Sequence, residues 1–229
     1  AIISTSQTTV QVGPDQTYVN ASVPIEPYYG YSYTQTIIDA ADLTAAGLQN
    51  GSVISALIYE YSSTVLTNSD NWDVYVGLTG KNTFTGENDW IDINLLEPFA
   101  FATTPAISPG VSPNGVSDVR ITADAPFVWN GSSNIVIAVD ENSPNFGSSA
   151  DDFYCHSTGA SKSLTYYSDG INPNPAGPPA ALYVYEYIPN LRVIATDVSC
   201  ASLPFSLNFE GGSSWNTDWT VNSGGTLSA

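Results

Sequence analysis

Methionine is absent from this chain, histidine occurs once and cysteine twice. One histidine cannot supply a metal centre built from several imidazoles, and no nucleophile motif surrounds His156. We therefore expect His156 to be an exposed loop residue. Cys155 and Cys200 lack the CxxC spacing of redox and zinc sites, and whether they form a disulfide stays open. Without an initiator methionine, the chain is expected to be a processed product or a fragment of a longer protein.

Lysine and arginine are also scarce. Four Lys and Arg stand against 22 Asp and Glu, which gives a formal net charge of -18. Binding to nucleic acid or to an anionic membrane surface depends on Lys and Arg, so neither partner is expected. No apolar run approaches the roughly 18–20 residues that span a bilayer, so we expect no membrane insertion. The excess of acid suits a secreted protein at the cell surface, where divalent cations are met.

Good helix formers such as Lys and Glu are also few, whereas Thr, Ser, Val and Tyr are common, which favours strands. Residues alternate between apolar and polar in Trp72–Leu78, whereas Ile135–Val139 is apolar throughout, as in a central strand. Only residues 39–48 favour a helical turn. The sequence predicts an all-β fold, an antiparallel β-sandwich of jelly-roll type over residues 1–195. Six positions are expected in its core: Trp72, Val74, Val76, Ile135, Ile137 and Val139.

A change of pattern near residue 196 predicts a domain boundary. We expect a linker over residues 196–203 and the beginning of a second β domain over residues 204–229, a stretch too short to form its own core. Four large aromatic residues in that stretch need a partner surface or the rest of such a domain: Phe205, Phe209, Trp215 and Trp219.

Six motifs, in this order, carry a resemblance: Tyr29–Ile37, Asn71–Gly77, Pro126–Gly131, Asn134–Asn142, Asp152–Cys155 and Tyr187–Leu191. Together they resemble an extracellular β-sandwich module of large secreted surface proteins of Bacteroidetes. Many such proteins are exported by the type IX secretion system, and they include gliding-motility adhesins. The resemblance covers residues 1–195 and is not specific for one function. The segment Phe205–Trp219 is similar to the opening of a jelly-roll domain of cleaved-adhesin or MAM type.

The densest group of carboxylates follows the apolar run. Asp140 and Glu141 come directly after it, and Asp151 and Asp152 come after an intervening loop. Ca²⁺ takes six to eight oxygen ligands, which carboxylates on adjacent loops and backbone carbonyls supply. We therefore predict a calcium site made by Asp140, Glu141, Asp151 and Asp152. Two alternatives stay open: a solvated acidic loop, and a glycosidase pair made by Asp140 and Asp152.

Tyrosines form the other distinctive group. Tyr28, Tyr29 and Tyr31 cluster in a turn-rich stretch where loop exposure is expected. Exposed rings can stack on sugar rings while nearby Asp and Asn accept hydroxyl protons, so these three tyrosines are candidate ligand-binding residues. The alternating tyrosines of a later strand are expected to pack within the sheet: Tyr183, Tyr185 and Tyr187.

These features together predict a non-catalytic extracellular module of a large cell-surface adhesin. Such a module would contact polysaccharide or a cell-surface glycan, or would space adjacent modules of the same long chain. The alternative is an accessory carbohydrate-binding domain of a secreted hydrolase whose catalytic domain lies elsewhere. The length and neighbouring domains of the parent chain would separate the two.

Overall fold

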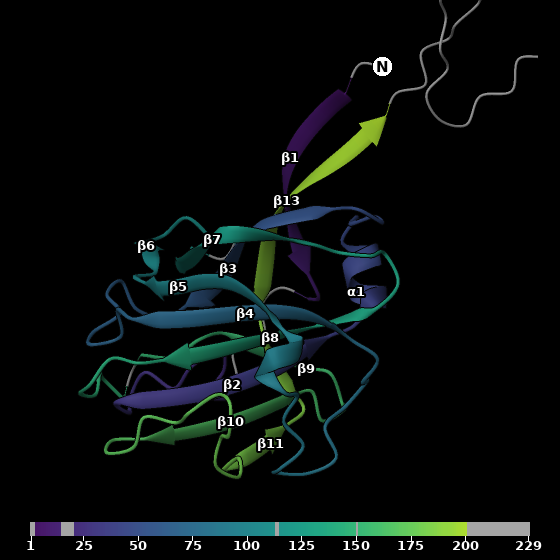
Figure 1. The fold of residues 1–229 in the computed structure, drawn as a ribbon. Helices are drawn as coiled ribbons and strands as arrows, with labels where there is room; N and C mark the ends of the chain where they lie inside the picture. The colour runs from purple at the N-terminus through teal and green to yellow at the C-terminus, as the bar shows by residue number, and fades with distance from the viewer. Residues whose placement is uncertain (1–2, 15–20, 113–114, 150, 201–229) are drawn as a thin grey trace, which may run out of the picture.

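The structure is a computed structural model that describes residues 3–14, 21–112, 115–149 and 151–200. Strands dominate it (Figure 1), and helical structure in these ranges is limited to α1 (Ala40–Ala45) and the short 3-10 helix η1 (Ile93–Leu95). The predicted helical turn within residues 39–48 is confirmed. The strands are β1 (Ile3–Val12), β2 (Tyr31–Ile38), β3 (Val53–Tyr61), β4 (Trp72–Thr79), β5 (Glu97–Thr103), β6 (Ala106–Ser108), β7 (Ser117–Val128), β8 (Asn134–Glu141), β9 (Cys155–Ser157), β10 (Ser163–Ser168), β11 (Tyr183–Tyr185), β12 (Tyr187–Pro189) and β13 (Leu191–Cys200).

Two antiparallel sheets face each other. The six-stranded sheet has the order β11-β10-β2-β8-β4-β5, which Figure 1 shows from bottom to top, and the five-stranded sheet has the order β1-β13-β3-β7-β6. Strands β12 and β9 form a small separate pair. The connections from β2 to β3 and from β3 to β4 cross from one sheet to the other, as in jelly-roll sandwiches. The predicted all-β antiparallel sandwich is confirmed.

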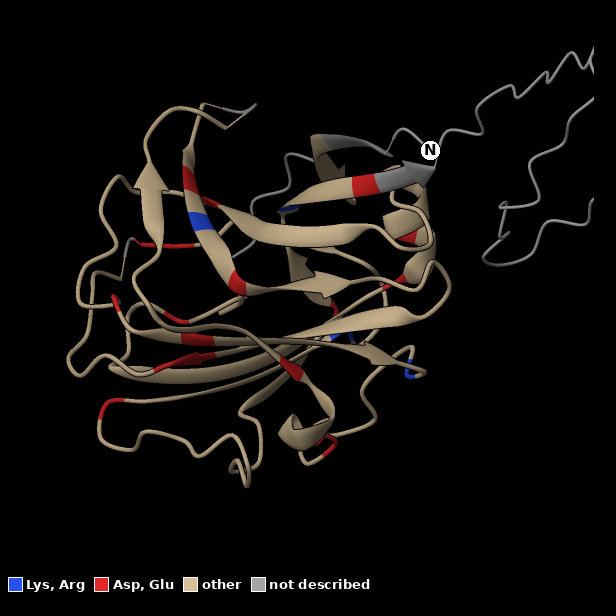
Figure 2. Cartoon of the chain, turned by 45° about the horizontal axis from the view of Figure 1, so that its top comes forward, with Lys and Arg blue, Asp and Glu red and all other residues tan. Residues whose placement is uncertain are grey.

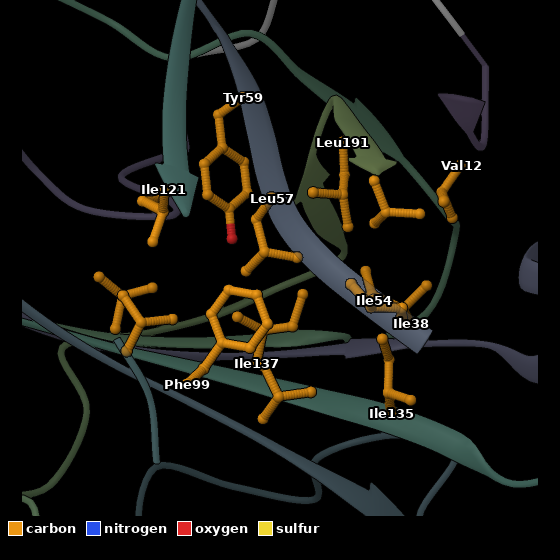
Figure 3. Close-up of a cluster of buried hydrophobic side chains, with 14 of the residues drawn as sticks. Val12, Ile38, Ile54, Leu57, Tyr59, Phe99, Ile121, Ile135, Ile137 and Leu191 are labelled. Carbon is orange, nitrogen blue, oxygen red and sulfur yellow. The ribbon is translucent and has the colours of Figure 1, made fainter. Parts of the chain in front are cut away.

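The main core lies between the two sheets. Figure 3 shows Ile135 and Ile137 of β8 facing Leu57 of β3 across this core. All six predicted core side chains belong to it, none more than 3% exposed, so that prediction is confirmed. Alternation explains the result, because every second residue of a strand points to the same face of its sheet.

The outer face of the six-stranded sheet is covered as well. Val136 and Ala138 of β8 point away from the main core and pack against Phe84, Ile91 and Leu96, from the segment between β4 and β5. Strand β8 is therefore buried on both faces. This double burial is the physical reason why Ile135–Val139 has no polar alternation.

The first part of the expected linker, residues 196–200, belongs to a strand instead. Strand β13 continues to Cys200, and β1 pairs with it along its whole length, from Ile3 opposite Cys200 to Val12 opposite Leu191. Residues 196–200 therefore form strand. The expected second domain, residues 204–229, lies outside the described residues.

Candidate functional site

A continuous row of aromatic rings runs along one end of the six-stranded sheet. Tyr29 stacks on Tyr167 of β10, with 4.2 Å between ring centroids. Tyr167 lies 6.1 Å from Tyr183, and Tyr183 stacks on Tyr185 at 5.1 Å with the planes only 9° apart. Tyr28 extends the row with an edge contact to Tyr29 at 5.4 Å. Rings from three separate parts of the chain thus form one surface.

Two further rings lie at the ends of this row. Phe146 lies 6.3 Å from Tyr28, and Tyr187 lies 6.4 Å from Tyr185. Phe146 is 61% exposed, and Tyr28 and Tyr183 are each 45% exposed. Three rings of the row are therefore accessible to solvent. We call these seven residues the aromatic row: Phe146, Tyr28, Tyr29, Tyr167, Tyr183, Tyr185 and Tyr187.

Strand register explains how β10 and β11 contribute to the row. Thr165 lies opposite Tyr183, so Thr165 and Tyr167 share a face with Tyr183 and Tyr185. The loop before β2 is bound to the same face. The Thr34 hydroxyl donates to the Pro24 carbonyl at 2.5 Å, and the Thr165 hydroxyl donates to the Ser22 carbonyl at 3.2 Å. This loop continues into Tyr28 and Tyr29, which brings their rings beside Tyr167.

The phenols of the row are hydrogen-bonding groups that can both donate and accept. Burial and a hydrogen bond with Tyr183 raise the pKa of Tyr167, and burial raises the pKa of Tyr185. A buried carboxyl, Glu26, lies in the adjoining loop, where it accepts from the Ser22 hydroxyl at 2.5 Å and from the Tyr28 amide at 3.2 Å. Burial raises the pKa of Glu26. The row can therefore donate to and accept from neutral polar ligands.

The predicted ligand-binding tyrosines fall on two surfaces. Tyr28 and Tyr29 lie in the aromatic row. Tyr31 starts β2 and alternates with Ser32, which lies opposite Tyr167, so Tyr31 belongs to the other face of the sheet, with Tyr33. The sequence does not single out Tyr167 or Phe146 as ligand-binding residues. The two-residue spacing of Thr165 and Tyr167, which places both side chains on one face of a strand, is a signal that could have indicated Tyr167. The alternating tyrosines do pack: Tyr185 contacts both Tyr183 and Tyr187. Tyr185 and Tyr187 also pack against the small buried cluster of Ala21, Val23 and Cys155.

The four carboxylates of the predicted calcium site do not share one place. Asp140 and Glu141 are consecutive in β8, so they point to opposite faces of the sheet. Asp140 lies directly opposite Asp73 of β4. Glu141 accepts from the backbone amide of Ser143 at 2.9 Å. Asp151 and Asp152 lie in the loop before β9.

Asp151 and Asp152 are held by other contacts. The Asp152 amide donates to the Ser62 hydroxyl at 2.9 Å, and the Ser62 amide donates to the Asp152 carbonyl at 2.9 Å. Burial, followed by the nearby Asp151 carboxylate, raises the pKa of Tyr61. Among the described residues, no group of three or more His, Cys, Asp or Glu could hold a metal ion. The structure therefore does not assemble the predicted calcium site from its four carboxylates.

Asp140 is an unusual carboxyl. It is 4% exposed, its Oδ1 is buried without a hydrogen-bond partner, and its Oδ2 accepts from Asn142 at 3.3 Å. Burial, with a smaller contribution from Asp73, raises the pKa of Asp140 to about 7. Burial also raises the pKa of Glu141 to about 7. Both acids therefore keep their protons to a much higher pH than an ordinary carboxyl group does.

No basic side chain is available to neutralise Asp140 instead. Figure 2 shows how few Lys and Arg the molecule carries. Three of them pair with Asp residues elsewhere, and the fourth, Arg120, donates to the Thr122 hydroxyl at 3.3 Å. The three ion pairs are Lys81 with Asp89, Lys162 with Asp39, and Arg192 with Asp118.

His156 is buried, contrary to the expectation of an exposed loop residue. It lies in β9, is 3% exposed, and its Nδ1 lies 2.9 Å from the Oδ1 of Asn190. The Asn190 amide donates in turn to the Glu60 carboxylate at 3.0 Å. A buried imidazole needs such partners, and the sequence gives no sign of them because Glu60 and Asn190 are distant in the chain. Cys155, the preceding residue, is a buried free thiol.

None of the described helices is long and apolar enough to cross a membrane. Comparison with known proteins gives no relative: no protein-family model, no curated protein and no solved structure matches this chain.

Proposed function

We propose that this protein is a non-catalytic extracellular module that binds polysaccharide along the aromatic row. One observation carries the proposal: seven aromatic rings from four segments of the chain form one continuous, partly exposed surface. Solvent-exposed aromatic side chains on a rigid sheet are typical of recognition surfaces, because they bury a large contact area with little loss of conformational entropy.

The chemistry of the row favours a neutral glycan. Its phenol hydroxyls can donate to and accept from sugar hydroxyls, while its exposed rings can pack against the apolar faces of sugars. Lys and Arg are absent from the row, and the chain carries a net charge of -18. An acidic polysaccharide would be repelled by that charge. The ligand class that the row fits is therefore an uncharged polysaccharide or cell-surface glycan.

Weak binding by each module is sufficient for adhesion. Linked modules bind a repeating polymer with high effective concentration, so avidity exceeds the affinity of one site. In this proposal the protein lies at the cell surface, where adjacent modules of the same long chain bind the polymer together. This proposal includes secretion and adhesion, and it assigns no reaction to the module.

The proposal is tested on a glycan array that contains both neutral and acidic polysaccharides. The substitutions Tyr28→Ala and Tyr183→Ala should each weaken binding to a neutral polysaccharide by about threefold to tenfold, the value of one aromatic contact. Tyr31→Ala is the matched control, because Tyr31 lies on the other face of the sheet and should leave binding unchanged. Binding that depends on Tyr31 but not on Tyr28 or Tyr183 would contradict the proposal, as would binding to acidic glycans alone.

A further inference from the structure

The strand edges of the sandwich differ sharply in how they are protected. An edge strand exposes unpaired backbone N–H and C=O groups, and proteins usually shorten, charge, bulge or interrupt such strands. In the described residues, β6 and β11 are edge strands of only three residues each. Beyond β6, the rest of β7 carries Asp124 and Pro126. Strand β5 carries Glu97 and Pro98, and its pairing with β4 shifts register twice.

Strand β1 has none of these protections. It is ten residues long and contains no charged residue and no proline. Its pairing with β13 runs without a register shift from Ile3 to Val12. Its only hydrogen-bonded neighbour strand among the described residues is β13, so no described strand pairs with its other edge. Gln7, Thr8 and Thr9, at the middle of the strand, are exposed.

The position of β1 also makes its edge accessible. Strand β13 pairs with β3 only over Leu191–Thr196, whereas it pairs with β1 as far as Cys200. The ends of β1 and β13 therefore continue as a two-stranded ribbon beyond the body of the sandwich, which Figure 1 shows at the top. A two-stranded ribbon is marginally stable alone, and an added strand would stabilise it.

We propose that β1 is the strand by which two copies of this chain pair edge to edge, in antiparallel orientation. A two-fold axis brings the same strand of each copy together, which makes the two five-stranded sheets one continuous sheet. Two copies of the same strongly acidic chain repel each other over most of their surface. The whole chain carries a net charge of -18, and β1 is an uncharged strand on which two such chains meet with the least local repulsion. The exposed side chains of Gln7, Thr8 and Thr9 can form hydrogen bonds across the pair.

The pairing has a consequence for binding. The aromatic row lies on the six-stranded sheet, and β1 is at the edge of the other sheet. A dimer paired through β1 therefore carries two aromatic rows, one on the six-stranded sheet of each copy. The pairing itself does not depend on the proposed glycan binding.

The test is the oligomeric state of the full 229-residue chain, measured by sedimentation equilibrium from micromolar to millimolar concentration. We expect a monomer–dimer equilibrium that strengthens as salt screens the net charge, since the Debye length falls from about 8 Å to about 3 Å between physiological and molar salt. Hydrogen exchange should show β1 amides gaining protection as the dimer forms. Sedimentation gives the number of chains in the assembly, and hydrogen exchange identifies the strand that makes the contact.

A matched pair of variants decides where the contact lies. Thr8→Glu/Thr9→Glu places two acids near the middle of β1, where they meet their own copies, and should weaken dimerisation at least about tenfold, equivalent to about 1.4 kcal/mol. Thr64→Glu/Thr67→Glu adds the same charge at exposed threonines of a loop and should leave dimerisation within about twofold of the parent chain. Thermal melting of each variant confirms that the sandwich is folded.

Three outcomes overturn the proposal. One is a monomer at every concentration and salt level. Another is a dimer that both variants weaken equally, and the third is a dimer whose β1 amides exchange as fast as in the monomer. Loss of dimerisation only in Thr8→Glu/Thr9→Glu, together with protection of β1 in the parent dimer, supports it.

Discussion

Replacing Asp140 with asparagine should make the protein more stable at pH 8 and change little at pH 4. The perturbation removes a carboxyl that is 4% exposed and whose Oδ1 has no hydrogen-bond partner. Asparagine has nearly the shape of the protonated acid, so packing around position 140 is kept. The substitution therefore isolates the cost of ionising a buried carboxyl that no basic side chain neutralises.

The size of the effect follows from the pKa. Burial raises the pKa of Asp140 from 3.8 to about 7. One pKa unit corresponds to about 1.4 kcal/mol, so ionised Asp140 lowers the free energy of unfolding by on the order of 4 kcal/mol at pH 8. Relaxation and water penetration reduce such costs in real proteins, and we expect a measured gain of about 2–4 kcal/mol for Asp140→Asn.

The pH dependence has a definite sign. The folded protein holds the Asp140 proton more tightly than the unfolded chain does. The stabilising contribution of the proton is therefore complete below about pH 4, and it is lost as pH rises through the folded pKa near 7. Glu141, whose pKa is also raised to about 7, acts in the same direction.

Urea unfolding at pH 4, 6 and 8 measures this effect through the free energy of unfolding at each pH. The difference between Asp140→Asn and the parent chain should grow from near zero at pH 4 to its full value at pH 8. Glu87→Gln, at an exposed acid, controls for the change in net charge and should show no such growth. An Asp140→Asn variant that is destabilised equally at all three pH values would refute the reasoning.

Three further predictions concern packing, backbone conformation and cations. Ile137→Ala should lower the free energy of unfolding by about 2–4 kcal/mol in urea, because it opens a cavity between the two sheets; a loss below about 1 kcal/mol would contradict that packing. Gly131→Ala should lower the free energy of unfolding by at least about 1 kcal/mol, because Gly131 has a φ of 74° and an added Cβ would lie 2.7 Å from the Cβ of Asn50. An unchanged melting temperature would contradict this geometry. Replacing EDTA with millimolar Ca²⁺ should leave the melting temperature unchanged, because Asp140 and Glu141 point to opposite faces of the sheet and cannot bind the same ion. A clear rise in melting temperature would support the calcium site instead.

Local pattern was sufficient to predict the sandwich. The alternation in Trp72–Leu78 and the apolar run Ile135–Val139 each depend on a few consecutive residues, and both strands formed as expected. The burial of β8 on both faces follows directly from its composition. The fold class could therefore be predicted because the period of two along a strand is a local property.

The candidate sites were less predictable, because they depend on register between distant strands. Tyr29, Tyr167 and Tyr183 meet only once β10 pairs with both β2 and β11. The sequence predicts Asp140 and Glu141 as ligands of one calcium site, but β8 continues through both residues. Consecutive residues of a strand point to opposite faces of its sheet, so the two carboxylates are separated. The burial of His156 likewise depends on a partner, Asn190, that lies far along the chain.

Binding of a neutral polysaccharide at the aromatic row is the central claim, and chemical-shift mapping by NMR tests it most directly. The chain would be titrated with a soluble neutral polysaccharide that binds on the array. The account predicts shifts concentrated on Tyr28, Tyr29, Tyr167 and Tyr183 and their neighbours. The signals of Tyr31, and of Phe101, which contacts Tyr75 on the other face of the sheet, should not move. Shifts centred on Asp73 and Asp140, on the opposite face of the same sheet, would contradict it.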